Sequence, residues 1–477
     1  MWCLTVPAPK VAPIIVAALP IGNDLDADTL FAYLKKVLDG LIDRGIQVIS
    51  YACDGTEVER SVQCLLIGEA ERIDRVIKNP RTGGPDTTIT IIKYRSQPMC
   101  MIQDSKHALK TFRNNLFSGA RLLTLGNFTA IYERIREMAM EDGTPLFKRD
   151  VEKLDRQDDN AAARLFSADV LKFLTDKHPD HAGEIVYLFI FGELVDAYQN
   201  RSITHAERLK LVLRARYFLD AWETFLDNSE YKRSHYFLSR EATDIARIII
   251  EGYIALMLIH RDHLPHPFPL LPWLHSTEAC EHGFGEARKI VKDFTLLDLI
   301  YMIPRLRIKI REAVFRAQGS DPKARAAGYN HTYFDNTGIN VSNLGAYPAD
   351  EDIGDIADTA AQEADSVLAL LGLVPSQLHR MQAQKSSTVT PLPSIDSWFK
   401  PGGTADDADN VDESEGDESD TESLSEAQQL QNLLDQEEDK TLSRSKKQEQ
   451  ELLNLTCATM AILADEAMIV YVFHDLT

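Results

Sequence analysis

The stretch Ile46-Gln-Val-Ile-Ser-Tyr-Ala-Cys53, followed at once by Asp54-Gly55, decides how the rest of the chain is interpreted. Its apolar and β-branched residues predict a buried strand. Open α/β sheets place their working groups where strands end, so Asp54 occupies a position suited to a metal ligand or a catalytic carboxylate. Asp54-Gly55 is equally typical of a simple turn, and the local pattern does not separate the two interpretations.

Upstream of this stretch, residues 11–19 form another β-branched run, and residues 28–44 have the apolar spacing of an amphipathic helix that ends at Gly45. Two strands separated by a crossover helix predict parallel neighbours in one sheet. The first fifty residues are therefore expected to be α/β, with strands 11–19, 46–53 and 98–103 in one sheet.

Downstream, residues 87–94 and 98–103 predict two more strands, the second leading into Asp104. From residue 105 to about residue 252 we expect no further strand, because the pattern becomes helical. The clearest helical segments are residues 161–174, 185–198, 206–226 and 242–259. This predicts a long all-α segment after the last strand.

Polar residues recur every three positions after that strand: Asp104, His107, Lys110 and Arg113. On a helix they form a stripe that could touch a metal ion or a phosphate backbone. The alternative is that Asp104 is a helix N-cap and the other three belong to a solvated face.

A second acidic group, Glu278, Glu281 and Glu286, lies at the start of a helix for which Ser276 or Thr277 is a plausible N-cap. Glu278 and Glu281 share a face at i, i+3. Acidic residues in a first turn also suit the helix dipole, so the pattern alone indicates a site only weakly.

Charge is unevenly distributed along the 477 residues, whose formal net charge is −22. Residues 401–426 hold eleven Asp and Glu and no Lys or Arg, which is half of that charge. Residues 288–325, in contrast, contain more Lys and Arg than Asp and Glu. Such a locally basic strip can bind phosphates even on an acidic protein. The expected nucleic-acid contacts are Arg288, Lys289, Arg305, Arg307, Lys309 and Arg311, together with Lys110 and Arg113.

The six cysteines show no Cys-x-x-Cys pair. Prolines interrupt the cluster formed by His260, His263, His266, His275, Cys280 and His282, so no zinc is expected. No Gly-x-x-x-x-Gly-Lys-Ser/Thr segment occurs, and hence no P-loop or GTP site is expected. The N-terminus lacks the pattern of a signal peptide, and Asp465 and Glu466 interrupt the apolar stretch 452–473. We expect a nuclear or cytoplasmic protein that is neither secreted nor inserted in a membrane.

Taken in order, four landmarks resemble the P-element and THAP-type transposases, cousins of the hAT superfamily. The strand ending in Asp54-Gly55 is similar to the segment with the family's second catalytic Asp. Asp104-Ser-Lys-His-Ala-Leu-Lys-Thr-Phe-Arg-Asn-Asn115 resembles its Asp-x-x-His-x-x-Lys segment. Asp159-Asn-Ala-Ala-Ala-Arg-Leu-Phe-Ser167 and Phe189-Ile-Phe-Gly-Glu-Leu-Val-Asp-Ala-Tyr-Gln-Asn-Arg-Ser202 resemble its helical insertion domain. Glu278-Ala-Cys-Glu-His-Gly-Phe-Gly-Glu-Ala-Arg288 is similar to the segment with its closing catalytic Glu, matched by Glu281.

The resemblance spans residues 11–288 and implies Mg²⁺- or Mn²⁺-dependent phosphoryl transfer on DNA, with carboxylates holding two metal ions. It implies that Asp54 and Glu281 are catalytic metal ligands, with Asp104, His107 and Glu278 as further candidates. The strand at 11–19 fits the family's third strand. The chain is therefore expected to lack the strand with the first catalytic Asp, as either an incomplete gene model or a decayed or domesticated remnant.

The expected fold is a partial α/β RNase H-like core with a large all-α insertion and a disordered acidic C-terminal region. The expected divisions are residues 1–124 for the core, 125–270 for the insertion, 271–348 for the closing helix and basic helical segment, 349–385 for a helical segment, 386–426 for an acidic linker and 427–477 for C-terminal helices. The expected function is that of a transposase-derived protein that binds DNA weakly and is catalytically incomplete. The alternative is a non-catalytic chromatin-associated or interaction protein whose acidic tail binds a basic partner, and either could form a homo-oligomer.

The composition of residues 386–426 generates a first prediction. Such a segment cannot bury enough apolar area to offset the entropy of ordering it. Deleting it should leave the midpoint of thermal unfolding nearly unchanged, as measured by circular dichroism. A shift of many degrees would mean that the segment packs against the rest of the protein.

Overall fold

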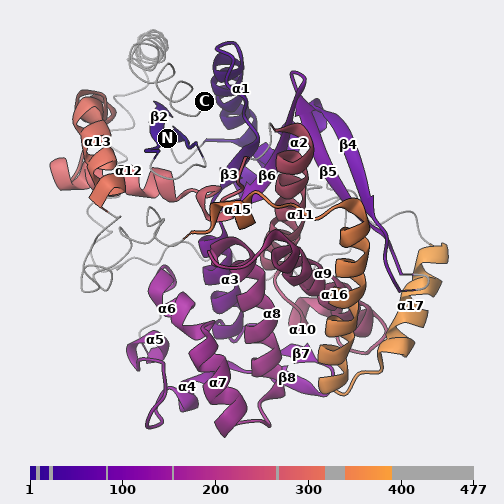
Figure 1. The fold of residues 1–477 in the computed structure, drawn as a ribbon. Helices are drawn as coiled ribbons and strands as arrows, with labels where there is room; N and C mark the ends of the chain where they lie inside the picture. Colours follow the sequence, from indigo (N-terminus) through magenta and orange to yellow (C-terminus); the bar gives the residue numbers. More distant parts are fainter. Residues whose placement is uncertain are drawn as a thin grey trace, which may run out of the picture.

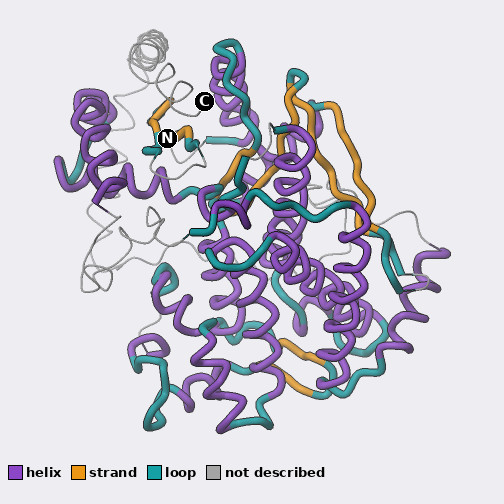
Figure 2. Tube along the Cα trace, in the orientation of Figure 1, coloured by secondary structure: helices purple, strands orange, loops and turns teal. Residues whose placement is uncertain are grey.

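The structure, a computed structural model, describes residues 1–6, 11–20, 25–81, 84–152, 155–264, 268–316 and 339–388. Within these ranges the protein is mostly helical and contains a small mixed sheet (Figures 1 and 2). The predictions for the acidic residues 401–426 and for helices over 427–477 lie outside the described residues.

The central sheet has the strand order β3-β6-β5-β4. Strand β3 (Ser50–Cys53) is parallel to β6 (Gln97–Gln103), whereas β5 (Thr87–Tyr94) is antiparallel to both β6 and β4 (Glu71–Ile77). The predicted strands at 87–94 and 98–103 are confirmed. The sequence analysis missed β4 because most of its residues are exposed and charged, as is common in edge strands.

The strand predicted at 11–19 is not part of this sheet, so its expected parallel pairing with residues 46–53 is wrong. Strand β2 (Ile14–Ala17) instead pairs antiparallel with β1 (Trp2–Leu4), which supplies it with a separate partner. The second predicted strand is also shorter than expected and begins at Ser50. Before it, Val48 N donates to the side-chain Oε1 of Gln97 in β6 at 3.1 Å and not to a backbone carbonyl of that strand.

Alternate residues of the sheet face two different helical layers. Met99 and Met101 of β6 pack with α1 (Ala27–Ile42) and α2 (Glu57–Glu69), whereas Cys100 and Ile102 face the larger helical body. This division follows from the two-residue period of a strand. The sheet is therefore covered on both sides, and the helix expected over 28–44 is confirmed as α1, with Gly45 at a φ of 74° beyond its end.

The larger body begins with α3 (Ser105–Phe117) and continues through the helices of the segment that was expected to be all-α. These are α4 (Tyr132–Met138), α5 (Arg149–Glu152), α6 (Asp159–Leu165), α7 (Ala168–Lys177), α8 (Ala182–Gln199), α9 (His205–Asp227), α10 (Arg233–Tyr236) and α11 (Arg240–His263). A short hairpin of β7 (Leu123–Leu125) and β8 (Phe128–Ala130) interrupts the series, contrary to expectation. The single helix predicted at 161–174 is divided, because the Ser167 side chain caps a new helix by accepting from Val170 N.

The remaining elements are η1 (Pro272–Leu274), α12 (Glu278–Ile290), α13 (Leu296–Arg316), α15 (Val341–Leu344), α16 (Asp350–Leu370) and α17 (Pro375–Thr388). Helix α16 packs along α9, and its apolar residues share one core with the sheet, α3, α8 and α11. The expected division at 124/125 is therefore not a break in packing. Helix α17 extends to Thr388, so the expectation of no regular structure is wrong for residues 386–388. No described helix combines the length and apolarity needed to cross a membrane.

The close approach of α11 to the sheet depends on Gly252. A Cβ atom at this position would lie 2.7 Å from the carbonyl oxygen of Met101 in β6. A backbone atom cannot yield as a flexible side chain can, so the helix would have to move away.

We therefore predict that Gly252→Ala destabilises the fold by about 1–3 kcal/mol, the usual cost of overpacking. A matched control is Gly354→Ala in α16, where nothing lies within 4 Å of the new methyl group. That variant should be more stable by about 0.5–1 kcal/mol, because glycine is a poor helix former. Denaturant unfolding measures both, and equal effects would contradict the close packing at Gly252.

Candidate functional site

Two aspartates stand at the same edge of the central sheet. Asp54 follows Cys53 at the end of β3, and Asp104 follows Gln103 at the end of the parallel strand β6. Cys53 and Gln103 are register partners, and Asp104 N donates to Cys53 O at 2.9 Å. The parallel pairing therefore places the two acids side by side at the carboxyl ends of their strands.

Asp104 is 1% exposed, and its two carboxylate oxygens bind two different helices. Oδ1 accepts from Lys106 N and His107 N at 2.8 and 3.2 Å, which caps α3. Oδ2 accepts from Thr277 N at 2.9 Å and from Thr277 Oγ1 at 2.8 Å, at the start of α12. The interpretation of Asp104 as an N-cap is confirmed, and both oxygens are engaged in joining helices, which leaves little of this carboxylate for a metal ion.

The link between α3 and α12 brings Glu281 to His107. The Nε2 atom of His107 lies 2.8 Å from Oε1 of Glu281, 174 positions away in sequence. Burial lowers the pKa of His107, but the contact with Glu281 and the charge of Asp104 outweigh burial and raise that pKa above its ordinary value. His107 thus tends to carry a positive charge beside the Glu281 carboxylate.

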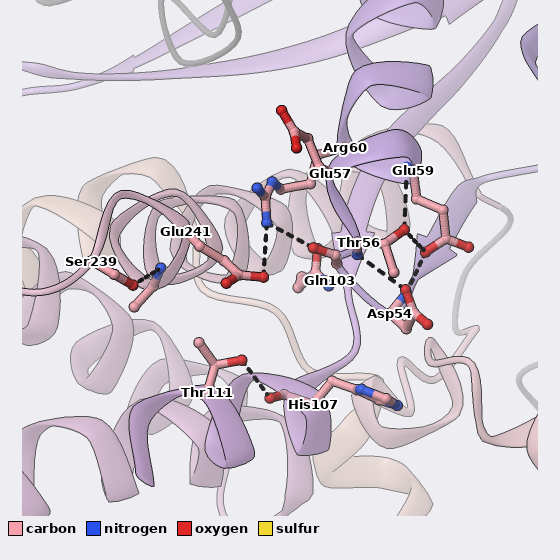
Figure 3. A network of polar contacts seen from close by, with 12 residues as sticks. Asp54, Thr56, Glu57, Glu59, Arg60, Gln103, His107, Thr111, Ser239 and Glu241 are labelled. Carbon is pink, nitrogen blue, oxygen red and sulfur yellow. Dashed lines mark hydrogen bonds and ion pairs between the residues drawn. The ribbon is translucent and has the colours of Figure 1, made fainter. Parts of the chain in front are cut away.

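Asp54 is bound to the first turn of α2 (Figure 3). Its Oδ1 accepts from Thr56 N at 3.1 Å, and its own N–H donates to Glu59 Oε2 at 3.2 Å. Burial raises the pKa of Asp54. The hydrogen bonds with Glu59 and Thr56 and the charge of His107 lower that pKa by more than burial raises it, so the net shift is downward. The charge of Glu281 acts in the opposite direction, which means that Asp54, His107 and Glu281 lie in one electrostatic neighbourhood.

Glu59 is a member of the site that the sequence analysis missed. Burial, followed by its hydrogen bond with Asp54 and the charge of that residue, raises the pKa of Glu59 to about 8. At neutral pH Glu59 therefore holds the proton that the two carboxyl groups share, while Asp54 is ionised. The available signal was Thr56-x-x-Glu59, a helix-start pattern that indicates a cap and not a site.

The turn after β3 needs its glycine. Gly55 has a φ of 101°, and a Cβ atom there would lie 2.2 Å from Nε2 of Gln103. Arg60 donates to the Gly55 carbonyl at 2.7 Å and reaches Glu241 at 3.4 Å, which ties the turn to α11 (Figure 3). The turn and the site are therefore the same feature, and the two interpretations of Asp54-Gly55 do not exclude each other.

Glu278 lies on α12 one turn before His282, the neighbour of Glu281, and is 1% exposed. Its carboxylate lies 2.7 Å from Nζ of Lys106. Burial raises the pKa of Glu278 to about 7, against the opposing effect of Lys106. This contact holds the start of α12 against α3.

The structure places Lys110 and Arg113 inside the protein. Lys110 is buried and lies 3.0 Å from Asp159, at the start of α6. Arg113 is 1% exposed and donates to the carbonyls of Asp155 and Asp150 at 2.9 and 3.0 Å. Both side chains join α3 to the segment from α5 to α6, and their contact with nucleic acid stays a prediction.

The other basic candidates lie on α12 and α13. Arg288, Lys289, Arg305 and Arg311 are exposed, and Arg307 and Lys309 are half-buried. Because α13 is a helix, its cations form two pairs on different sides, Arg305 with Lys309 and Arg307 with Arg311. The buried residues Leu306 and Ile310 lie between them, so the strip is not one continuous basic face.

Two of the histidines weighed as zinc ligands, His260 and His275, lie against each other in the structure. His260 and His275 are buried with ring centroids 5.9 Å apart, and burial lowers their pKa values to about 4 and about 3. His275 Nδ1 lies 2.8 Å from Ser50 Oγ. These rings are held neutral within the protein core, and His266 lies outside the described residues.

Comparisons of the chain with protein-family models, curated proteins and solved structures gave no match.

The shared proton on Glu59 generates a prediction about pH. The pKa of Glu59 is about 8 in the folded protein and lies near 4.3 in an unfolded chain, so the folded state binds the proton more tightly. Stability from this group is complete below the unfolded pKa and is lost as pH rises through about 8. The lowered pKa of Asp54 acts at more acidic pH and does not oppose this loss.

Between pH 5 and pH 9, the wild-type protein should therefore lose thermal stability relative to Glu59→Gln, which mimics the protonated side chain. Glu57→Gln, an exposed carboxyl in the same turn, is the control and should follow the wild type. Melting curves at the two pH values test this. Parallel behaviour of the wild type and Glu59→Gln would refute the shared proton.

Proposed function

We propose that this chain is a transposase-derived protein with an RNase H-like core that binds DNA and a divalent metal ion on Asp54 and Glu281. The observation that carries the proposal is the contact of Glu281 with His107 across the whole helical segment, together with the effect of both charges on the pKa of Asp54. One of them ends a strand and the other lies in the first turn of a helix. Perturbed acids gathered in this way are candidates for function rather than for packing.

The arrangement of the sheet supports the core assignment. β3 and β6 are parallel neighbours, each is followed by an acid, and an antiparallel pair extends the sheet beyond β6. Among the described residues β3 has β6 as its sole strand partner, so its other edge can take a further strand. An RNase H-like core would use that edge for the strand with the first catalytic Asp.

The donor set fits Mg²⁺ or Mn²⁺ in kind. Asp54 and Glu281 offer carboxylate oxygens, the ligands that Mg²⁺ prefers, and Glu59 adds a third carboxyl group beside Asp54. A bound ion of this type stabilises charge on a phosphoryl group during transfer. Asp54 is already ionised, whereas Glu59 must release its proton and His107 must yield Glu281 before all three carboxylates are available.

Three groups of the protein then have distinct tasks. The Thr56 N–H orients Asp54, and Glu59 controls how much negative charge gathers beside it. His107 holds Glu281 in place in the absence of an ion. Two-metal chemistry needs carboxylates that bridge both ions, and Asp104 is engaged as a cap, so we expect metal binding without efficient strand cleavage.

A second candidate function is a non-catalytic interaction protein. It is favoured by the fact that both carboxylates already have protein partners, Asp54 with Thr56 and Glu59, and Glu281 with His107. In that case these contacts serve only to join β3, α3 and α12. Metal binding separates the two candidates.

The test is Mn²⁺ binding to the full chain, followed by electron paramagnetic resonance. Asp54→Asn and Glu281→Gln should each weaken binding by at least about tenfold, since even residues that merely support a metal ligand contribute that much. The control is Glu286→Gln, also on α12, whose side chain pairs with Lys289 at 2.7 Å. Equal Mn²⁺ affinity in all four proteins would exclude the metal site and favour the interaction protein.

DNA provides the accompanying prediction. Labelled duplex should bind weakly and lose affinity steeply as salt rises, because any contacts come from dispersed cations on an acidic protein. With Mg²⁺ or Mn²⁺ no cleavage or joining should occur. Cleavage that disappears in both Asp54→Asn and Glu281→Gln would show that the site is complete, with Glu59 as the foremost candidate for the third carboxylate.

A further inference from the structure

A second group of metal-ligating side chains lies between α7 and α8. His178, Asp180 and His181 each offer one ligand atom, and these atoms all lie within 4.8 Å of one another. Glu141, from the loop after α4, joins them, since its Oε1 is 2.7 Å from Nε2 of His178. In the described part of the chain, these three ligand atoms are thus already close enough to share one ion.

The backbone of this turn is fixed by its own hydrogen bonds. His178 ends α7 and donates its N–H to Leu174 O at 2.8 Å, and His181 N donates to His178 O at 2.9 Å. His181 is the N-cap residue of α8, yet its side chain makes no capping hydrogen bond. Both imidazoles are thus held at helix ends, with His178 Nε2 beside the Glu141 carboxylate and His181 Nδ1 without a hydrogen bond.

Those nitrogens are poorly satisfied by the protein. Within the described part of the chain, Nδ1 of His181 is buried and has no hydrogen-bond partner. Nε2 of His178 is also buried and, although close to Glu141, is not aligned to donate a hydrogen bond. Leaving buried polar atoms without partners costs about 1–3 kcal/mol each, so a ligand that uses these nitrogens would be favoured.

We propose that His178, His181, Asp180 and Glu141 bind one zinc ion. Two imidazoles and one or two carboxylates are a mixed nitrogen and oxygen set, which suits Zn²⁺ and not Mg²⁺. The two rings are stacked at present, with centroids 4.8 Å apart and planes at 11°. Binding turns them out of the stack so that a nitrogen of each points at the ion.

The ion would act as a structural clip. It joins the loop after α4 to the end of α7 and the start of α8, and adds to the contacts that Glu184 of α8 makes with Ile131 N and Arg134. The clip is separate from the carboxylate site. Helix α8 has 18 residues, which is about 27 Å of rise, and its far end contacts Ser105 of α3 through Gln199 at 2.8 Å. Figure 1 shows α4 and α7 beside the opposite end of α8 from α12.

The experiment uses the full chain, stripped of metal with a chelator and titrated with ZnCl₂ or MgCl₂ by calorimetry. We expect one zinc ion per chain, no Mg²⁺ bound by these residues, and a higher melting temperature with zinc present. His178→Ala and His181→Ala should each weaken zinc binding by at least about tenfold. His235→Ala, which removes an exposed histidine elsewhere in the helical body, should bind zinc as the wild type does.

Asp180→Asn distinguishes the loss of a zinc ligand from the loss of the fold. The Asp180 side chain is 81% exposed, so the substitution should leave the metal-free melting temperature unchanged and still weaken zinc binding. The proposal would be overturned if the wild type bound no zinc in the titration. It would also be overturned if the double variant His178→Ala/His181→Ala bound zinc as tightly as the wild type. The zinc titration tests this proposal alone. The effect of Asp54→Asn on Mn²⁺ binding tests the proposed function separately.

Discussion

The carboxylate of Asp104 is the interaction on which the arrangement of the site depends. One oxygen caps α3 and the other binds the first residue before α12, so a single buried side chain joins β6 to two helices. Hydrogen bonds to an ionised acceptor are roughly twice as strong as neutral ones, and burial strengthens them further. Thr277 fixes the start of α12, and Glu281 lies one turn further along that helix. The Glu281 carboxylate therefore contacts His107 on α3.

The hydrogen bonds of Asp104 bring several carboxyl groups to one edge of the sheet, where their negative charges repel one another. Within the described residues the protein balances them with a proton on Glu59 and with the raised pKa of His107. Asp54 remains ionised between these two groups. In the function we propose, a divalent cation replaces both of these balancing charges.

Much of the helical layout could be predicted from the sequence, because long amphipathic helices such as α9 and α11 have a strong apolar period and clear caps. Strand pairing was less accessible. β2 has the composition of a core strand, yet it pairs with Trp2–Leu4, and no local pattern encodes which partner a strand selects. β4 has only Ile73 and Ile77 directed at the core among charged, exposed neighbours, so its pairing becomes visible only when β5 is beside it.

The site shows the same limits. The landmarks Asp54, His107 and Glu281 could be found from their order, but their roles depended on partners far away in sequence. Lys110 and Arg113 resemble a basic stripe and are in fact buried against α6 and the loop before it. Glu59 and the cluster at His178 were not singled out, because a helix cap and a Pro-containing turn are common features with no functional signature.

The most direct test of the central claim is a crystal structure of the full chain soaked in Mn²⁺, with the ion located by its anomalous scattering. We expect a peak within about 2.0–2.5 Å of carboxylate oxygens of both Asp54 and Glu281, with His107 displaced from Glu281. A Mn²⁺ ion bound elsewhere, with the contact between His107 and Glu281 intact, would contradict the metal site and leave these acids as structural links.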